Sequence, residues 1–212
     1  MSGVMTLGAY SLLAFSSIFV IVDSVGVIPT FLAMTAGNKP EERIRMARLA
    51  CWVATGVLIF FSVSGMAIFK LFGITLPAFQ IAGSLLLLII AYDMLQARRS
   101  TVQETEAEKE AGTIKDDIAI TPLAVPMLAG PGAITTTILM RNRAENAFHV
   151  LALLAAIVVV GFISYLILKL AARGSQWLSP IAIKIITRLM GLLLAAVAVQ
   201  FILNALAELK IL

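Results

Sequence analysis

The stretch Asp-Ser-Val-Gly-Val-Ile-Pro-Thr at residues 23–30 interrupts the first long apolar segment of this chain, and Ala-Gly-Pro-Gly-Ala-Ile-Thr-Thr at residues 129–136 interrupts a later one. An offset of 106 residues superimposes the two stretches and aligns identical residues, namely Gly26 with Gly132, Ile28 with Ile134 and Thr30 with Thr136. A second similarity, at an offset of 108, aligns residues 79–83 with residues 187–191, and both segments end in glycine. Apolar spans interrupted by glycine or proline at corresponding positions of two repeats are the best sequence indication of a transporter's binding site.

The composition indicates a membrane protein. Of the 212 residues, 60% are hydrophobic and only 13% are charged, and the mean hydropathy is +1.01. A soluble domain of this length cannot bury so much apolar surface, so lipid must surround much of the chain. The net charge of +4 does not indicate a nucleic-acid partner, because the basic residues are spread among the loops and do not cluster in one soluble region.

Charged residues divide the apolar sequence into six runs, each close to or longer than the length a helix needs to cross a bilayer, which is about 20 residues. The first run covers residues 4–34 and is longer than the rest, as a tilted or broken helix would be. The other five cover residues 49–69, 71–92, 118–140, 150–168 and 189–207. No Lys or Arg precedes Lys39, so the first run does not resemble a cleaved signal peptide and we expect it to remain in the protein.

The predicted fold is an all-α polytopic membrane protein with six transmembrane helices. One long polar segment, residues 96–117, separates repeat one (residues 1–95) from repeat two (residues 118–212) of a single membrane domain. Because each repeat crosses the membrane three times, the two repeats must enter it from opposite faces, which makes a 3+3 inverted repeat. Helices one and four carry the two interruptions, so we expect both to be broken.

Basic residues are distributed unequally between the two sides of the membrane. With six crossings, the loops 35–48, 96–117 and 169–188 share one side, and they hold 12 of the 16 Lys and Arg residues. By the positive-inside rule this side is the cytoplasm. The prediction is a multi-pass membrane protein with both termini on the periplasmic or extracellular side.

Asp23 is the one acidic residue predicted to lie far from a membrane surface. At about 1.5 Å rise per residue, its distance from Lys39 brings it within a turn or two of the midplane. An ionised carboxylate at that depth is costly unless it faces a cavity or a cation, so we predict that Asp23 and the adjacent Ser24 bind a coupling ion. The structural alternative is an acid that caps the helix after it, where Pro29 suits the first turn, and the two roles are compatible.

The second interruption predicts a site for a carboxylate. Its prolines and glycines prevent continuous helical hydrogen bonding, which lipid tolerates only where protein or a water-filled cavity supplies partners. The helix that restarts at Ala133 presents free N–H groups and the positive end of its dipole. With its counterpart in repeat one, this break gives the predicted substrate-binding residues, which are Gly26, Pro29, Gly130, Pro131, Gly132, Ala133, Thr135 and Thr136. The alternative for any single proline is a simple kink.

Other polar residues in the spans are weaker candidates. Gln80, Arg188 and Gln200 are candidates for polar support of the site, although snorkelling or hydrogen bonding between helices also explains such side chains. His149 is expected to cap the outer end of the fifth span. Close helix approach is expected at Gly65, Gly83, Gly161 and Gly191. One His and one Cys cannot form a Ser–His–acid triad or a metal-ligand cluster, so we expect no enzyme, no metal and no cofactor beyond a transported Na⁺ or H⁺.

These residues resemble those of the MarC family of bacterial and archaeal inner-membrane proteins, which are also classed as neutral amino acid transporters. The resemblance covers nearly the whole chain and rests on residues 23–29, 79–83, 121–126, 129–134 and 186–193. The family typically carries Asn-Pro or Asp-Pro in the first motif, whereas this chain has Asp23-Ser24, a departure that bears on how sharply the first span is broken. The resemblance implies cation-coupled movement of small neutral amino acids such as glycine or alanine.

We therefore predict a secondary transporter of small neutral amino acids, with the lipid bilayer and the substrate as its partners. Asp23 would bind the coupling cation or the substrate ammonium, and the helix start near Gly132 would bind the carboxylate. The alternatives are an exporter of amino acids, drugs or other small metabolites, a membrane-embedded enzyme, and a membrane assembly protein without a polar cavity. The sequence leaves open the substrate, the coupling ion, the direction of transport, any homo-oligomer, and whether the broken segments are re-entrant.

Overall fold

Helices make up all the regular secondary structure in the part of the chain that the computed structural model describes, which is residues 6–35, 37–96, 119–174 and 180–209. In chain order they are α1 (Leu7–Val22), α2 (Ser24–Met34), α3 (Pro40–Phe72), α4 (Leu76–Leu95), η2 (Ala119–Leu128), α6 (Pro131–Asn142), α7 (Ala147–Gly174) and α8 (Pro180–Glu208). The element η2 is a π-helix. Apart from Gln96, the predicted linker lies outside the described residues. The all-α class is confirmed for the described part.

Five helical segments of the described chain are long and apolar enough, by length and composition, to cross a membrane. The first combines α1 with most of α2, and the others are α3, α4, α7 and the later part of α8. The remaining predicted span, residues 118–140, is divided between η2 with 10 residues and α6 with 12. Neither part reaches the about 20 residues of a continuous span. The chain is therefore interrupted at both predicted places, and the fourth run is not one continuous helix.

The helices extend beyond the apolar runs into segments that were expected to be loops. α3 already begins at Pro40, inside the expected loop 35–48, and the expected loop 169–188 contains the end of α7 and the start of α8. The reason is that charged residues do not end a helix that has left the lipid. Glu42 in the first turn of α3 suits the positive helix end, and its carboxylate accepts a hydrogen bond from the Lys39 backbone N–H at 3.4 Å.

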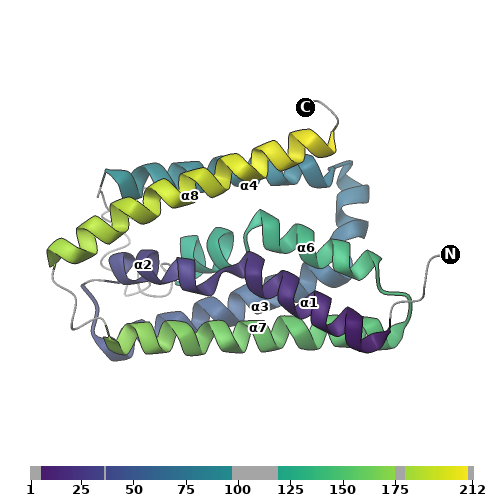
Figure 1. The fold of residues 1–212 in the computed structure, drawn as a ribbon, viewed down its shortest axis with the longest axis horizontal. Coiled ribbons are helices and arrows are strands. Elements are labelled where there is room, and N and C mark those ends of the chain that lie inside the picture. The colour runs from purple at the N-terminus through teal and green to yellow at the C-terminus, as the bar shows by residue number, and fades with distance from the viewer. Residues whose placement is uncertain (1–5, 36, 97–118, 175–179, 210–212) are drawn as a thin grey trace.

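The helices form three layers (Figure 1). The broken segments α1, α2, η2 and α6 lie in the middle, between the pair α3 and α7 on one side and the pair α4 and α8 on the other. Towards one side, α7 contacts α1 and α2, while α3 contacts η2 and α6. Towards the other, α8 contacts α2, while α4 contacts η2 and α6. Both helix breaks therefore lie in the layer between the two pairs of unbroken helices.

Large apolar side chains lie on the outer surface of the described chain as well as in its core. Large side chains that are fully buried between the layers include Tyr10, Phe31, Leu123 and Ile157. Large apolar side chains also cover the outside, for example Leu12, Trp52, Leu71, Phe148 and Leu170, which are all about 70% exposed or more. Water would penalise such a surface, whereas lipid does not. This pattern agrees with a protein that lies in the membrane.

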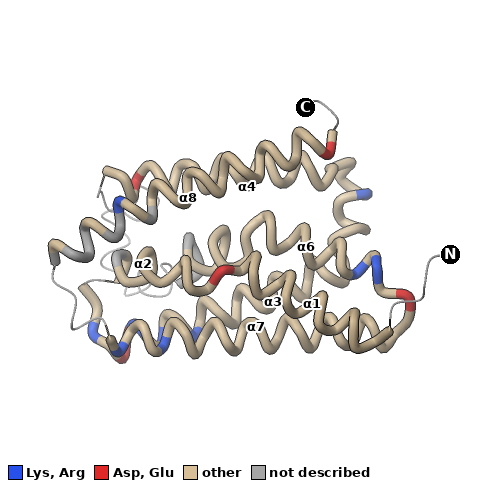
Figure 2. Tube along the Cα trace, viewed as in Figure 1, with Lys and Arg blue, Asp and Glu red and all other residues tan. Residues whose placement is uncertain are grey.

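The charged residues of the described chain gather at the two ends of the helices (Figure 2). The start of α1 and the end of α8 lie at the same end of the molecule (Figure 1). A single acidic segment lies midway between the ends, at the junction of α1 and α2, and in the sequence this is Asp23 (Figure 2). The prediction that Asp23 lies far from both membrane surfaces is supported by this distribution.

Gly191 marks a close approach between α8 and α4. A Cβ at this position would lie 3.0 Å from the Ala91 carbonyl oxygen and 3.1 Å from the Leu95 backbone nitrogen. Because backbone atoms cannot move aside easily, we expect Gly191→Ala to destabilise the protein by about 1–3 kcal/mol, measured as a lower Tm in detergent.

Gly56, in the middle of α3, is the matched control because a Cβ there would meet nothing within 4 Å. We expect Gly56→Ala to leave the Tm unchanged or to raise it, since alanine favours a helix over glycine by up to about 1 kcal/mol. Equal effects of the two substitutions would show that the contact between α4 and α8 does not depend on glycine.

Candidate functional site

Asp23 ends α1 and begins α2. Its backbone is in the left-handed region (φ 42°, ψ 54°), which Asp tolerates better than most residues. Its N–H donates to the Phe19 carbonyl at 3.3 Å, and its carboxylate Oδ1 accepts from the Gly26 N–H at 3.1 Å. A Cβ on Gly26 would overlap the Asp23 carboxylate, so glycine is needed there. Asp23 therefore has the capping role that the sequence offered as the structural alternative.

Asp23 and Ser24, the predicted ion-coupling pair, point in different directions. The Asp23 side chain is exposed, at a depth midway between the charged ends (Figure 2). Lipid contact would be costly for an ionised carboxylate at that depth. Ser24 is buried, and its hydroxyl lies 2.5 Å from Ser164 Oγ of α7. One member of the pair is thus exposed and the other is held in the protein interior.

The second break lies between η2 and α6. Gly130 has an extended backbone (φ −72°, ψ 172°) and precedes Pro131, which occupies the first position of α6. The helix therefore restarts at Pro131, two residues before the predicted Ala133. A Cβ on Gly130 would lie 2.5 Å from the Pro126 carbonyl oxygen. No side chain fits at this position, so none can cap α6 from it.

The first turn of α6 keeps backbone donors without acceptors. Gly132 and Ala133 are both buried, and within the described chain neither N–H makes a hydrogen bond. The N–H of the next residue, Ile134, donates to the Gly130 carbonyl at 3.0 Å. Two amides at the positive end of the helix dipole thus lack an acceptor in the described chain.

Two side-chain oxygens near this helix start also lack partners. α4 contacts α6 and runs in the opposite direction (Figure 1), and a Cβ on Gly83 of α4 would lie 2.6 Å from Pro131. One turn from this contact, in opposite chain directions, are Gln80 on α4 and Thr135 on α6. Gln80 Oε1 and Thr135 Oγ1 are buried without a hydrogen-bond partner in the described structure. Each such atom costs about 1–3 kcal/mol unless a ligand satisfies it.

Phe201 of α8 covers the same helix turn. Its ring atom Cζ would lie 2.6 Å from a Cβ on Gly132, so the ring rests on the glycine backbone. The space near the Gly132 amide is therefore narrow, with α4 on one side and α8 on the other. Sequence analysis did not select Phe201, because one more aromatic residue in an apolar span carries no distinguishing signal.

The two equivalent breaks have unequal exposure. Asp23 is exposed and Val25 is 60% exposed. At the matching positions, 106 residues later, Ala129 is 1% exposed and Pro131 is buried. One break is thus open and the other is closed within the same structure.

The remaining predicted residues do not all join the α6 site. Thr136 is half-buried on the first turns of α6, and Pro29 is half-buried inside α2. Gln200 is exposed, and its amide donates to Asn204 Oδ1 at 2.8 Å on its own helix. Arg188 is exposed near the start of α8. Of the three candidates for polar support, only Gln80 has a buried unpaired atom beside the α6 start.

His149 is buried near the start of α7, where its side chain packs against Tyr10. Its ring lies 4.6 Å from that of Tyr10, its Nδ1 accepts from the Glu145 N–H at 3.3 Å, and its side chain is 1% exposed. The cap of α7 is Asn146, whose Oδ1 accepts the His149 backbone N–H at 3.0 Å. Asn146 and His149 therefore both accept backbone N–H groups at the start of α7, so the His149 side chain takes part in capping this end of the helix together with Asn146.

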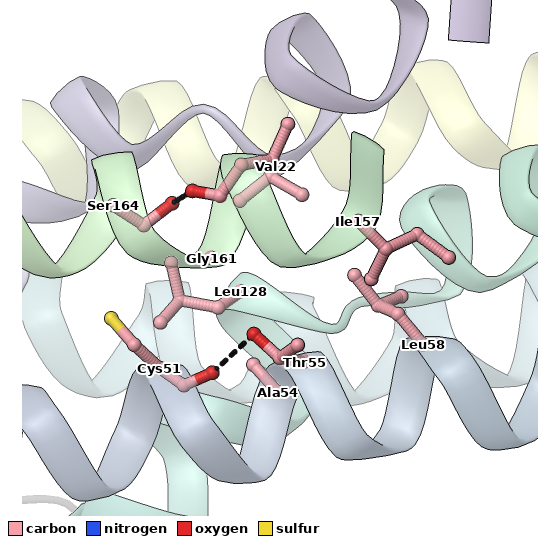
Figure 3. Close-up of a pocket in the computed structure, with 10 residues that line it drawn as sticks. Val22, Cys51, Ala54, Thr55, Leu58, Leu128, Ile157, Gly161 and Ser164 are labelled. Atoms are coloured by element: carbon pink, nitrogen blue, oxygen red, sulfur yellow. Dashed lines mark hydrogen bonds between the residues drawn. The ribbon is translucent and has the colours of Figure 1, made fainter. Parts of the chain in front are cut away.

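A small cavity that the sequence did not reveal lies between α3 and α7 (Figure 3). It measures about 10 Å³ and is lined by ten described residues from α1, α3, η2 and α7. At the offset of 106 they form five matched pairs, namely Val22 with Leu128, Cys51 with Ile157, Ala54 with Val160, Thr55 with Gly161 and Leu58 with Ser164. The repeat offset found at the two breaks therefore holds for the cavity as well.

Residues 9–210 match the family described as MarC family integral membrane protein. A UPF0056 membrane protein of Methanocaldococcus jannaschii is 39% identical over 195 residues, which cover 92% of this chain and 95% of the relative. The UPF0056 membrane protein YvbG of Bacillus subtilis is 37% identical, with 89% and 90% covered, and YhcE of Escherichia coli is 31% identical, with 89% and 87% covered. No solved structure matches the chain.

The cap at Asp23 predicts an order of stability. We expect the free energy of unfolding of Asp23→Asn to lie within about 0.5 kcal/mol of that of the parent protein. The reason is that Asn can also accept a hydrogen bond from the Gly26 N–H and tolerates a left-handed backbone. Asp23→Ala loses the cap and meets left-handed strain, so we expect it to lose about 2 kcal/mol. Thermal unfolding in detergent measures both, and an equal loss would show that the charge, and not the cap, stabilises the break.

Proposed function

The chain belongs to the MarC family of integral membrane proteins, and on that premise we propose that it is a secondary transporter of small neutral amino acids. The observation that carries the proposal is the group of unpaired buried polar atoms at the start of α6. It comprises the amides of Gly132 and Ala133, the hydroxyl of Thr135 and the side-chain oxygen of Gln80. Lipid and packed protein leave such groups unsatisfied, so they favour a polar ligand.

The chemistry of these atoms fits an amino acid. The two amides and the Thr135 hydroxyl can donate to a carboxylate, and the helix dipole favours its charge. Gln80 Oε1 can only accept, so it suits an ammonium group. The close contacts of Phe201 with Gly132 and of Pro131 with Gly83 leave little space beside the amides, which favours a small side chain.

We further propose that the fold is the 3+3 inverted repeat expected from the sequence. In this arrangement α1, α2, α3 and α4 of repeat one correspond to η2, α6, α7 and α8 of repeat two. When the repeats are exchanged, the contacts of α1 and α2 with α7 become the contacts of η2 and α6 with α3. The exchange also converts the contact of α2 with α8 into that of α6 with α4, and it leaves the pairs α3–α7 and α4–α8 unchanged. The matched lining of the cavity supports the same symmetry.

The unequal exposure of the two breaks supports alternating access. In an inverted repeat, a state with one break open and its mate closed has a counterpart in which the two are exchanged. Asp23, at the open break, is proposed to couple this exchange to Na⁺ or H⁺. The positive-inside rule favours a cytoplasmic location for the end where α3 begins, with both termini on the outer side of the inner membrane.

Transport in proteoliposomes tests the function. We expect labelled alanine and glycine to accumulate when an inward sodium or proton gradient is imposed, and to equilibrate without accumulation when no gradient is present. Asp23→Asn, which keeps the cap, should still bind alanine but should lose the gradient-driven accumulation. No uptake and no binding of either amino acid under any gradient would refute the proposal.

Replacing Thr135 should raise the stability of the protein and weaken its binding of alanine. Thr135→Val removes an unpaired buried hydroxyl, so we expect the free energy of unfolding without ligand to rise by about 1–3 kcal/mol, seen as a higher Tm. We expect the same variant to bind alanine about tenfold more weakly. Thr137 is the matched control, because its buried hydroxyl is satisfied by the Ile134 carbonyl at 2.8 Å. Thr137→Val should keep alanine binding, and equal binding losses in both variants would contradict the site.

A further inference from the structure

The turn between α6 and α7 forms one wall of a surface hollow that the amino acid site does not use. The hollow measures about 520 Å³ and lies at the end of the molecule where α1 starts (Figure 1). We propose that it binds the headgroup of a zwitterionic phospholipid, one that carries a phosphate and a primary ammonium group. The inference goes beyond the proposed function, because it concerns a bound lipid at the end of α6 that is opposite to the amino acid site.

Two opposite charges line the hollow without neutralising each other. Arg141 is the penultimate residue of α6, and Glu145 lies in the turn that follows. Within the described chain, neither side chain makes a hydrogen bond or an ion pair. A guanidinium group binds phosphate oxygens through two parallel N–H groups, and a carboxylate accepts hydrogen bonds from an ammonium group. A headgroup that carries both charges therefore matches this pair, whereas a purely anionic headgroup would be repelled by Glu145.

The backbone of the turn holds both charged residues beside the same hollow. The Ala144 N–H donates to the Arg141 carbonyl at 3.2 Å, and the Glu145 N–H donates to His149 Nδ1 at 3.3 Å. The His149 side chain is buried, so it fixes the turn to the interior of the protein. A ligand that binds here does not have to order the turn, which lowers the entropic cost of binding.

The rest of the hollow suits the hydrocarbon part of a lipid. Its lining continues onto the first turns of α7 with Val150, Leu151 and Leu154, and Leu151 is 65% exposed. The charged ends of the helices here give way to apolar segments (Figure 2), in the same order in which a headgroup gives way to acyl chains. The volume lies within the range of ligand-binding clefts, about 300–1,000 Å³. A free amino acid or inorganic phosphate would leave the leucines of this hollow without a partner.

Native mass spectrometry of the purified full-length protein in detergent tests the site. The fraction of lipid-bound protein is measured with phosphatidylethanolamine, phosphatidylglycerol or phosphatidylcholine that carry the same acyl chains. Phosphatidylglycerol has no ammonium group, and the ammonium group of phosphatidylcholine has no N–H to donate. We therefore expect phosphatidylethanolamine to bind about tenfold more tightly than either.

Two substitutions in the hollow should act differently on this preference. Arg141→Gln removes the partner of the phosphate, so we expect about tenfold weaker binding of phosphatidylethanolamine. Glu145→Gln removes the partner of the ammonium group and the repulsion of an anionic headgroup. This variant should therefore lose the preference for phosphatidylethanolamine over phosphatidylglycerol.

Arg143→Gln and Glu208→Gln are the matched controls. Both residues are exposed and lie at the same end of the molecule, and neither lines the hollow. The controls remove the same two charges as the test variants, so they should keep both the binding of phosphatidylethanolamine and the preference for it.

Three outcomes would overturn the inference: equal binding of the three phospholipids, a preference that persists in Arg141→Gln and Glu145→Gln, or equal losses in the two controls. Displacement of phosphatidylethanolamine by excess alanine would also overturn it, because the hollow would then be a site for the free amino acid. Failure of the proposed function looks different. Alanine would then neither bind nor accumulate, while the binding of phosphatidylethanolamine could still depend on Arg141 and Glu145.

Discussion

A backbone amide inside a bilayer has no water to bond to, and this constraint governs both helix breaks. At the first break Asp23 meets it with its own carboxylate, which accepts the Gly26 amide. At the second break the described chain offers no acceptor to Gly132 and Ala133, and it leaves two nearby side-chain oxygens unpaired as well. The helix start after the first break is therefore capped, whereas the helix start after the second break keeps backbone donors without acceptors.

The offset of 106 residues preserves shape more closely than chemistry. Thr55 is matched by Gly161 and Asp23 by Ala129, so hydroxyl and charge are present on one side of each pair alone. The polar groups are thus divided between the repeats, so that one repeat carries charge at its break and the other carries free backbone donors.

Much of this arrangement could be predicted from the sequence, because glycine, proline and a buried charge have strong local effects. The two breaks, the depth of Asp23 and the tight packing at Gly83 and Gly191 are examples. Thr55 and Ser164 could not be selected, because lipid is as apolar as the protein core and the usual contrast between an inner and an outer helix face is absent. Which hydroxyl faces a cavity then depends on helix rotation, which local sequence does not encode.

Gly130 limits which substitutions the helix start of α6 can accept during evolution. Helix starts are commonly sealed when one substitution introduces Ser, Asp or Asn at the capping position, and selection for stability favours such changes. Here any side chain would collide with the Pro126 carbonyl, so this simple route is closed. The open helix start is thus protected against drift by sterics alone, and a lineage could seal it only by rebuilding the π-helix that precedes it.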